Sequence, residues 1–398
     1  MQRTGKQPHG ASVDAPARRR VPWLVLGLVT LFAGCAVGPA PEKTDTGAGG
    51  HGAGKTPPGK KGEPPSGKAP ECSVATTLDL GSAEATSPAV AFAGGRFAVA
   101  WTEQHTGLHL AVADAQGNQA GARILATGAG PAEPAVSALP KGELLVAWQE
   151  AGAVRAIRVG SDAAPVGSAF TLDKAAGSDP RPSAAAAAGG TLIAWADPSG
   201  VTVGELNGSG VGPTATVAGA ADPALAPSAD ALVFTVGNQL GFARPALPLH
   251  GVNATIFRDL PGAIRGPRAS AAGGGSFFVT WEDDAAGDGN EAVDLTLVGA
   301  DGKPATPVAV PGEAGSANDP DVATLGGGYA AVVYYQWRDG PPVVYLSLFG
   351  PDLRRAGEDL RLSEKGARFP RVAAGEGALG VVYARQEAPA RLSLVTCH

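Results

Sequence analysis

The sequence is poor in charged and aromatic residues. Charged residues make up 17% of the 398 residues and aromatic residues 6%, and Met1 is the only methionine. Any core must therefore be built largely from small apolar side chains such as Ala, Val and Leu. The apolar run over residues 21–34 is too short for a comfortable membrane span.

Basic residues are also scarce outside the N-terminal segment. The formal net charge is −6, and from Cys72 onward the acids outnumber the bases. Because nucleic-acid binding needs a basic surface to neutralise phosphates, we expect no nucleic-acid partner. An acidic body could attract cations or basic ligands, although it also serves simply to keep an exported protein soluble.

The N-terminus carries an export pattern. Arg18–Arg20 precede the apolar run, which is typical of a signal peptide. The run ends in Leu31-Phe32-Ala33-Gly34-Cys35, which resembles the lipobox of bacterial lipoproteins. The resemblance implies that residues 1–34 are removed and that Cys35 is diacylated as the new N-terminus. Ala36 matches the pattern of delivery to the outer membrane, so we expect a lipid-anchored cell-envelope protein; the alternative is an ordinary cleaved signal peptide.

Residues 35–71 are predicted to be a flexible linker. They consist mainly of Gly, Pro, Lys and Thr, with almost no large apolar residue. Such a segment cannot bury enough surface to offset the entropy of ordering it. We therefore expect the folded body to comprise residues 72–398.

One phrase recurs through the body: a proline, a short strand of small residues, a glycine-rich turn, and an alternating strand that ends in an aromatic residue. Pro88 to Trp101 is the first copy. Residues 223–236 form a degenerate copy in which we identify no aromatic residue. The copies begin at seven anchor prolines, which lie about 43 to 53 residues apart: Pro88, Pro134, Pro180, Pro223, Pro267, Pro320 and Pro370.

That period is typical of a four-stranded propeller blade, so the sequence predicts an all-β, seven-bladed β-propeller. Val154–Asp173 resembles a repeat of bacterial surface and secreted proteins that has a Pro-x-Val-Ala start and a Val-Val-Trp strand. The resemblance is to a scaffold and carries no activity with it.

The last copy supplies only three strands, over residues 371–374, 379–384 and 391–396. We expect Ala75–Leu80 to complete that blade, because pairing the chain ends would close the ring. Cys72 and Cys397 would then replace the turn between these two strands. Exported cysteines are expected to oxidise, so we predict a Cys72–Cys397 disulfide, with buried free thiols or an intermolecular bridge as the alternatives.

Acids follow the aromatic residue in several copies, and they are the candidate binding residues. Loops on one face of the ring would carry Glu103, Glu150, Asp197, Asp283, Asp284 and Asp288. One interpretation is a carboxylate-lined entrance that binds a metal or a basic ligand. The other is turn chemistry, in which short acidic side chains hold loops through backbone N–H groups. Recurrence in most blades favours the structural interpretation.

Metal and catalytic signatures are weak. The acidic loop over residues 283–291 has the hard oxygen ligands that Ca²⁺ prefers, but its spacing differs from an EF-hand loop. His105 and His109 have no third zinc ligand nearby. We find no Gly-x-Ser-x-Gly motif, no phosphate-cradling loop and no sialidase-type Asp-box. The sequence therefore predicts no cofactor, no metal site and no catalytic residue.

The sequence favours a monomeric binding or interaction module for protein or glycan, presented on a lipid tether. One alternative is a propeller hydrolase or lyase acting on extracellular polysaccharide, and another is a structural component of the envelope. A central pocket with converging acids would favour the enzyme, and a pocket plugged by small side chains would exclude it.

Overall fold

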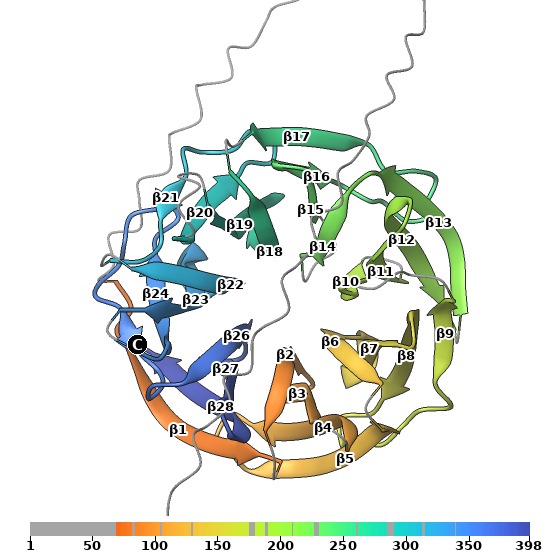
Figure 1. The fold of residues 1–398 in the computed structure, drawn as a ribbon, viewed down its shortest axis with the longest axis horizontal. Helices are drawn as coiled ribbons and strands as arrows, with labels where there is room; N and C mark the ends of the chain where they lie inside the picture. The colour runs from red at the N-terminus through yellow and green to blue at the C-terminus, as the bar shows by residue number, and fades with distance from the viewer. Residues whose placement is uncertain are drawn as a thin grey trace, which may run out of the picture. The chain divides into compact units, whose positions relative to one another are not determined.

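Seven four-stranded antiparallel sheets stand as blades around a central channel in the computed structural model (Figure 1). The structure describes residues 69–398 except 82–83, 104–105, 129, 175–179, 188–189, 209, 227–230, 260–261, 285–289, 313–314 and 339. The described strands belong to one compact unit, Glu63–His398. The fold is a seven-bladed β-propeller, as the repeat predicts. The predicted signal peptide, Cys35 and most of the predicted linker lie outside the described residues.

The first three blades follow one another along the chain. Blade 1 contains β2 (Ala85–Ala93), β3 (Arg96–Glu103), β4 (Gly107–Asp114) and β5 (Gln119–Thr127). Blade 2 contains β6 (Pro131–Ala138), the short 3-10 helix η1 (Pro140–Gly142), β7 (Leu144–Glu150), β8 (Ala153–Val159) and β9 (Phe170–Asp173). Blade 3 contains β10 (Ser183–Ala187), β11 (Gly190–Asp197), β12 (Gly200–Asn207) and β13 (Gly210–Ala218).

The next three blades have the same order. Blade 4 contains β14 (Ala221–Leu225), β15 (Leu232–Val236), β16 (Gln239–Ala243) and β17 (Ala254–Asp259). Blade 5 contains β18 (Ile264–Gly273), β19 (Ser276–Asp283), β20 (Ala292–Val298) and β21 (Val308–Ala309). Blade 6 contains β22 (Ser316–Thr324), the 3-10 helix η2 (Gly326–Gly328), β23 (Ala330–Trp337), β24 (Val343–Phe349) and β25 (Leu360–Arg361). The described residues contain no helix that could span a membrane.

Both ends of the chain build blade 7. It contains β26 (Ala367–Ala374), β27 (Ala378–Arg385), β28 (Ala388–Cys397) and, as its outer strand, β1 (Cys72–Leu80). The register places Leu80 opposite Ala390 and Cys72 opposite Cys397. This is the antiparallel pairing that the sequence predicts, extended to the two cysteines themselves.

A disulfide and charged contacts reinforce this closing pair. The Cys72 and Cys397 sulfurs are 1.97 Å apart, which confirms the predicted disulfide. Next to it, Glu71 and His398 exchange two backbone hydrogen bonds of 3.0 Å. Toward the other end of β1, Asp79 accepts hydrogen bonds of 2.8 Å from both Arg385 and Arg391. The Arg391 bond is the largest of the effects that hold the pKa of Asp79 below its usual value.

The packing between blades depends on one large aromatic side chain at the end of each second strand. Six of these side chains are buried: Trp101, Trp148, Trp195, Trp281, Tyr334 and Tyr383. The seventh position corrects the sequence interpretation of the fourth copy. Ala224 pairs with Val233 as Ala89 pairs with Ala100, so the fully buried Phe234 takes the place of Trp101. It was missed because fewer residues separate it from its anchor proline than in the other copies.

A bulge shapes the innermost strand of the blades. The residue before each anchor proline has a positive φ: Ser87, Glu133, Arg181, Asp222, Gly266, Asp319 and Phe369. In six blades the pairing register of the first strand shifts at this point, as expected where an extra residue re-aims the strand. This pattern corrects the anchor of the third copy, which is Pro182 and not Pro180.

We expect the double variant Cys72→Ser/Cys397→Ser to be less stable than the wild type. Freeing the two ends of a loop of 325 residues raises the entropy of the unfolded chain, so the free energy of unfolding should fall by up to about 5 kcal/mol. Chemical denaturation measures this loss. A reductant should lower the stability of the wild type but leave the double variant unchanged. Equal denaturation midpoints for oxidised and reduced wild type would contradict the closing role of the disulfide.

Candidate functional site

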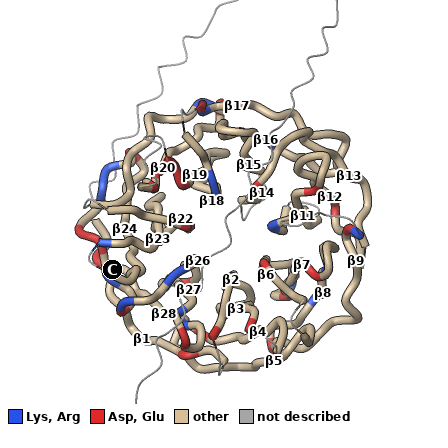
Figure 2. The backbone as a smooth tube through the Cα atoms, in the orientation of Figure 1, with Lys and Arg blue, Asp and Glu red and all other residues tan. Residues whose placement is uncertain are grey.

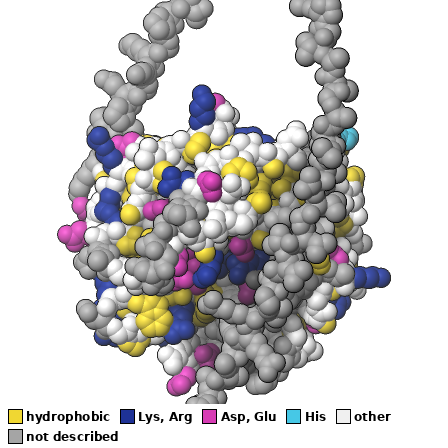
Figure 3. Space-filling view, turned by 45° about the horizontal axis from the view of Figure 1, so that its top comes forward, with side chains coloured by type: hydrophobic (Ala, Val, Ile, Leu, Met, Phe, Trp, Pro, Cys, Tyr) yellow, Lys and Arg dark blue, Asp and Glu magenta, His cyan; other side chains and the backbone are white. Residues whose placement is uncertain are grey.

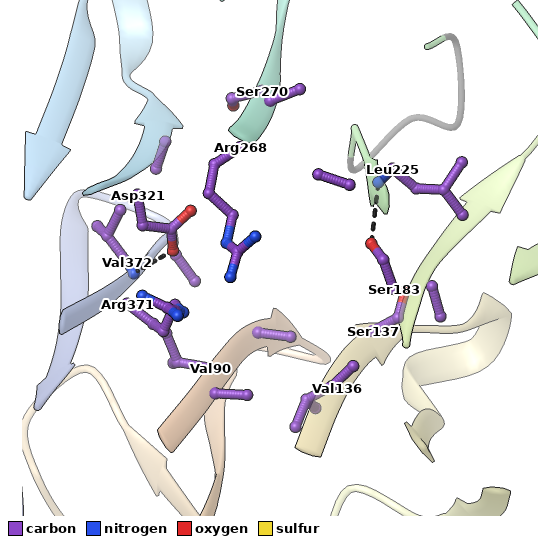
Figure 4. A pocket seen from close by; sticks show the side chains of 18 of the residues that line it. Val90, Val136, Ser137, Ser183, Leu225, Arg268, Ser270, Asp321, Arg371 and Val372 are labelled. Carbon is purple, nitrogen blue, oxygen red and sulfur yellow. Dashed lines mark hydrogen bonds between the residues drawn. The ribbon is translucent and has the colours of Figure 1, made fainter. Parts of the chain in front are cut away.

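A cavity of about 410 Å³ lies in the central channel. Its walls come from the innermost strands of all seven blades, namely β2, β6, β10, β14, β18, β22 and β26 (Figures 1 and 4). The volume is in the range of pockets that bind small molecules. The described side chains that line the channel therefore leave space between them.

One position of the repeat determines where charged side chains line the cavity. The residue that follows the anchor proline lines the cavity in every blade, and in four blades it is small: Ala89, Ala135, Ser183 and Ala224. In blades 5, 6 and 7 it is charged: Arg268, Asp321 and Arg371. Figure 2 shows basic positions at the inner ends of β18 and β26 and an acidic one at that of β22. Three successive blades thus make one side of the channel charged.

The two arginines of this charged side are held in the same way. Nη1 of Arg268 donates a 3.0 Å hydrogen bond to the carbonyl of Pro267, and Nη1 of Arg371 donates a 2.7 Å bond to the carbonyl of Pro370. Neither guanidinium forms an ion pair with a carboxylate of the described residues. Both are half-buried and extend toward the same space (Figure 4). The local backbone therefore fixes them while leaving most of their N–H donors for the cavity.

Asp321 lies between the two arginines and joins two blades. One of its carboxylate oxygens accepts the N–H of Val322 at 3.0 Å, and the other accepts the N–H of Val372 in blade 7 at 2.9 Å. Ser183 forms the equivalent bridge, because its hydroxyl accepts the N–H of Leu225 in the next blade at 2.9 Å. Asp321 thus satisfies a backbone donor on the open edge of its neighbour.

Burial and charge act together on these groups. Burial lowers the pKa of Arg268 to about 10, and repulsion from Arg371 contributes to the shift, so Arg268 stays protonated at neutral pH. The pKa of the Asp321 carboxyl is raised, because burial outweighs Arg371, Arg268 and the two backbone donors, which lower it. Basic and acidic side chains meet in the hollowed middle of the face seen in Figure 3.

A third arginine in the channel is differently placed. Arg181, which precedes the anchor proline of blade 3, forms an ion pair of 2.8 Å with Asp222. Its charge is therefore balanced within the protein. That side of the cavity also includes Val136, Ser137 and Leu225 (Figure 4), and the carboxylate of Glu133, which accepts a 3.3 Å hydrogen bond from the hydroxyl of Ser87.

Sequence reasoning missed this channel cluster. The available signal was the contrast between copies, because a position that is small in four of them carries Arg268, Asp321 and Arg371 in the last three. The three side chains converge only because the blades form a ring. The sequence predicts the ring, but not which side chains meet at its centre.

The acids that the sequence singles out are engaged within their own blades. Buried Glu103 accepts a 3.1 Å hydrogen bond from Nε1 of Trp101, and Glu150 forms a 2.7 Å ion pair with Arg155. Asp197 accepts hydrogen bonds from the backbone N–H of Ser199 at 2.7 Å and from the hydroxyl of Thr202 at 2.6 Å. None of the three lines the channel cavity among the described residues, so the acidic binding face stays a prediction.

The remaining acidic candidates lie in blade 5. Asp283 is buried, and its charge contributes, after burial, to raising the pKa of Asp294 to about 6. The backbone N–H of Asp284 donates a 3.1 Å hydrogen bond to the carbonyl of Ala263. Asp288 and the centre of the acidic loop lie outside the described residues. Within the described ones, no three His, Cys, Asp or Glu side chains are grouped to hold a metal ion.

One buried acid near the junction of blades 5 and 6 has an unusual protonation equilibrium. Glu282 accepts a hydrogen bond from the backbone N–H of Asp319, yet burial raises its pKa to about 7. The nearby charges of Asp319 and Glu291 act in the same direction, and Arg265 opposes them. The folded protein therefore keeps a proton on Glu282 at a pH where the unfolded chain has released it.

We expect the free energy of unfolding to fall by roughly 1–3 kcal/mol as the pH rises from about 5 to about 8. The sign follows from Glu282 and Asp294, whose pKa values in the folded state lie above the ordinary ones, so that deprotonation destabilises the folded state. Urea denaturation across this range measures the slope. Glu282→Gln should flatten its upper part and Asp294→Asn its lower part. The prediction fails if both variants keep the slope of the wild type.

Comparisons with known proteins identify no family for this chain. No protein-family model matches it, and no curated protein matches it. Among solved structures it is similar to the Dos1 propeller, with 11% identity over 82% of this chain and 95% of that one and a TM-score of 0.49. It is also similar to an arginine-substituted mutant of AofleA from Arthrobotrys oligospora, with 10% identity over 76% and 92% of the chains and a TM-score of 0.49. The WD40 domain of SCAP from fission yeast gives 10% identity, coverage of 82% and 98%, and a TM-score of 0.48.

Proposed function

We propose that this protein is a cell-envelope binding module that is anchored to the outer membrane through the lipidated Cys35 and holds part of a protein or glycan ligand in its central channel. The observation that supports it best is the cavity of about 410 Å³ that the described residues of all seven blades enclose. A closed ring supplies rigid walls, and rigid walls lower the entropic cost of binding.

The charges in the channel favour binding over hydrolysis. Polysaccharide hydrolases position a pair of carboxyl groups across the scissile bond. The carboxylates that line the cavity, Glu133 and Asp321, come from blades 2 and 6. Asp321 is engaged by two backbone N–H groups, and Glu133 accepts a hydrogen bond from the hydroxyl of Ser87. Both acids thus have structural partners, while two arginines keep free donors.

The anchoring part of the proposal predicts lipid attachment at one residue. In bacteria grown with radiolabelled palmitate, the full chain should become labelled and sediment with the outer membrane. Cys35→Ser should abolish both, because it removes the thiol that is acylated. Cys72→Ser is the matched control and should keep the label. Label retained in Cys35→Ser would contradict the anchor.

The binding part predicts that an obstruction in the channel abolishes ligand capture. The full chain in detergent, applied to a glycan array and to envelope extract, should retain a ligand. Ala135→Trp should lose it, because Ala135 lines the cavity and an indole would occupy that space. Val166→Trp, at a residue that is 46% exposed, is the control and should bind normally. Capture that survives the channel obstruction would place the ligand elsewhere, and failure of the wild type to capture anything would refute the binding module.

A further inference from the structure

Hydrogen bonds to the adjacent backbone hold the two channel arginines in place before any ligand binds. A guanidinium has five N–H donors, and in each arginine the structure uses one of them, for the carbonyl of the preceding proline. The same short contact at Arg268 and at Arg371 orients both groups toward one space (Figure 4). Little side-chain entropy therefore remains to be lost on binding.

The charges on this side of the channel do not cancel. Arg268 and Arg371 carry two positive charges, and Asp321 between them, whose pKa is raised by burial, carries at most one negative charge. Two more charged groups line the cavity. Arg181 is balanced by Asp222 at 2.8 Å, and Glu133 of blade 2 accepts a hydrogen bond from the hydroxyl of Ser87. A partly buried excess charge is unfavourable unless a counter-charge reaches it, so the cavity has a place for one small anion.

We propose that the channel binds a small ligand through a single carboxylate group, held between Arg268 and Arg371. This inference rests on the proposed binding function and specifies its ligand. The excess positive charge of the two arginines attracts an anion, and the planar guanidinium fork matches the two oxygens of a carboxylate.

The remainder of the ligand faces a wall whose carboxylate, Glu133, is engaged by the hydroxyl of Ser87. Opposite the charged side, the cavity is lined by Val136, Leu225 and the hydroxyl-bearing Ser137 (Figure 4). A cavity of about 410 Å³ accommodates a body of the size of an amino acid or a monosaccharide. The carboxylate could belong to the C-terminus of a peptide or to an acidic sugar, and both present the same group to the arginines.

Calorimetry on the full chain in detergent tests the inference with matched pairs of probes. N-acetyl-leucine is compared with the neutral N-acetyl-leucinamide, and D-galacturonate with D-galactose. At least one acid should bind more than about tenfold more tightly than its neutral partner, because it adds charge-assisted hydrogen bonds. The better acid identifies the source of the carboxylate. Its affinity should fall with added salt.

Substitution of the arginines tests the location. Arg268→Gln and Arg371→Gln should each weaken binding of the better acid by about tenfold or more while leaving its neutral partner unaffected. Arg181→Gln is the matched control from the same cavity and should change the affinity by less than about threefold, because Asp222 already balances Arg181. Near-ultraviolet circular dichroism verifies folding, and Arg371→Lys replaces any glutamine variant that does not fold.

The outcomes separate this inference from the function on which it rests. If acids and neutral partners bind equally, or if Arg181→Gln weakens binding as much as Arg268→Gln, the carboxylate site is overturned and a channel ligand of another kind remains. If no acid binds while the glycan array or envelope extract yields a ligand, the carboxylate inference alone fails. If neither yields a ligand, the binding function fails with it.

Discussion

The pairing of β1 with β28 is the constraint on which the rest of the molecule depends. Each blade packs its buried aromatic side chain against a neighbour, so the first and last blades need each other as much as any interior pair does. Because blade 7 takes its outer strand from the start of the chain, the ring cannot open between the two chain ends without breaking the sheet of blade 7. The Cys72–Cys397 disulfide, the backbone pair of Glu71 and His398, and Asp79 with its two arginines distribute this closure over the whole length of β1.

Because the ring is closed, the innermost strands of the seven blades line one central channel. Every first strand bends before its anchor proline and places the next residue at the axis, so one sequence position is presented seven times around a single space. Four blades keep this position small and leave room, while Arg268, Asp321 and Arg371 make one side charged. Asp321 and Ser183 also join adjacent blades, because they accept hydrogen bonds from the backbone N–H groups of Val372 and Leu225. Asp321 and Ser183 thus both join adjacent blades and line the cavity.

The period of the repeat and the missing fourth strand were enough to predict the fold, the closing strand and the disulfide, because each follows from counting strands. The alignment of individual copies was wrong where the spacing between the anchor proline and the aromatic residue differed. Pro182 and not Pro180 begins the third copy, and Phe234 fills the aromatic position of the fourth, since its separation from Pro223 is shorter than elsewhere. The acids drew attention because they recur after the aromatic residue, yet Glu103, Glu150 and Asp197 hold side chains and turns of their own blades. The channel cluster could not be predicted from spacing, because residues of blades 5 to 7 meet only through the curvature of the ring.

A crystal structure of the full chain soaked with N-acetyl-leucine or D-galacturonate tests the central claim most directly. The account predicts a closed seven-bladed ring, with density for the ligand carboxylate between the guanidinium groups of Arg268 and Arg371 and for its neutral body against the wall of Val136 and Leu225. A ligand bound on the rim of the ring with the channel empty would contradict it. So would a channel in which the two arginines are paired with carboxylates of the protein itself.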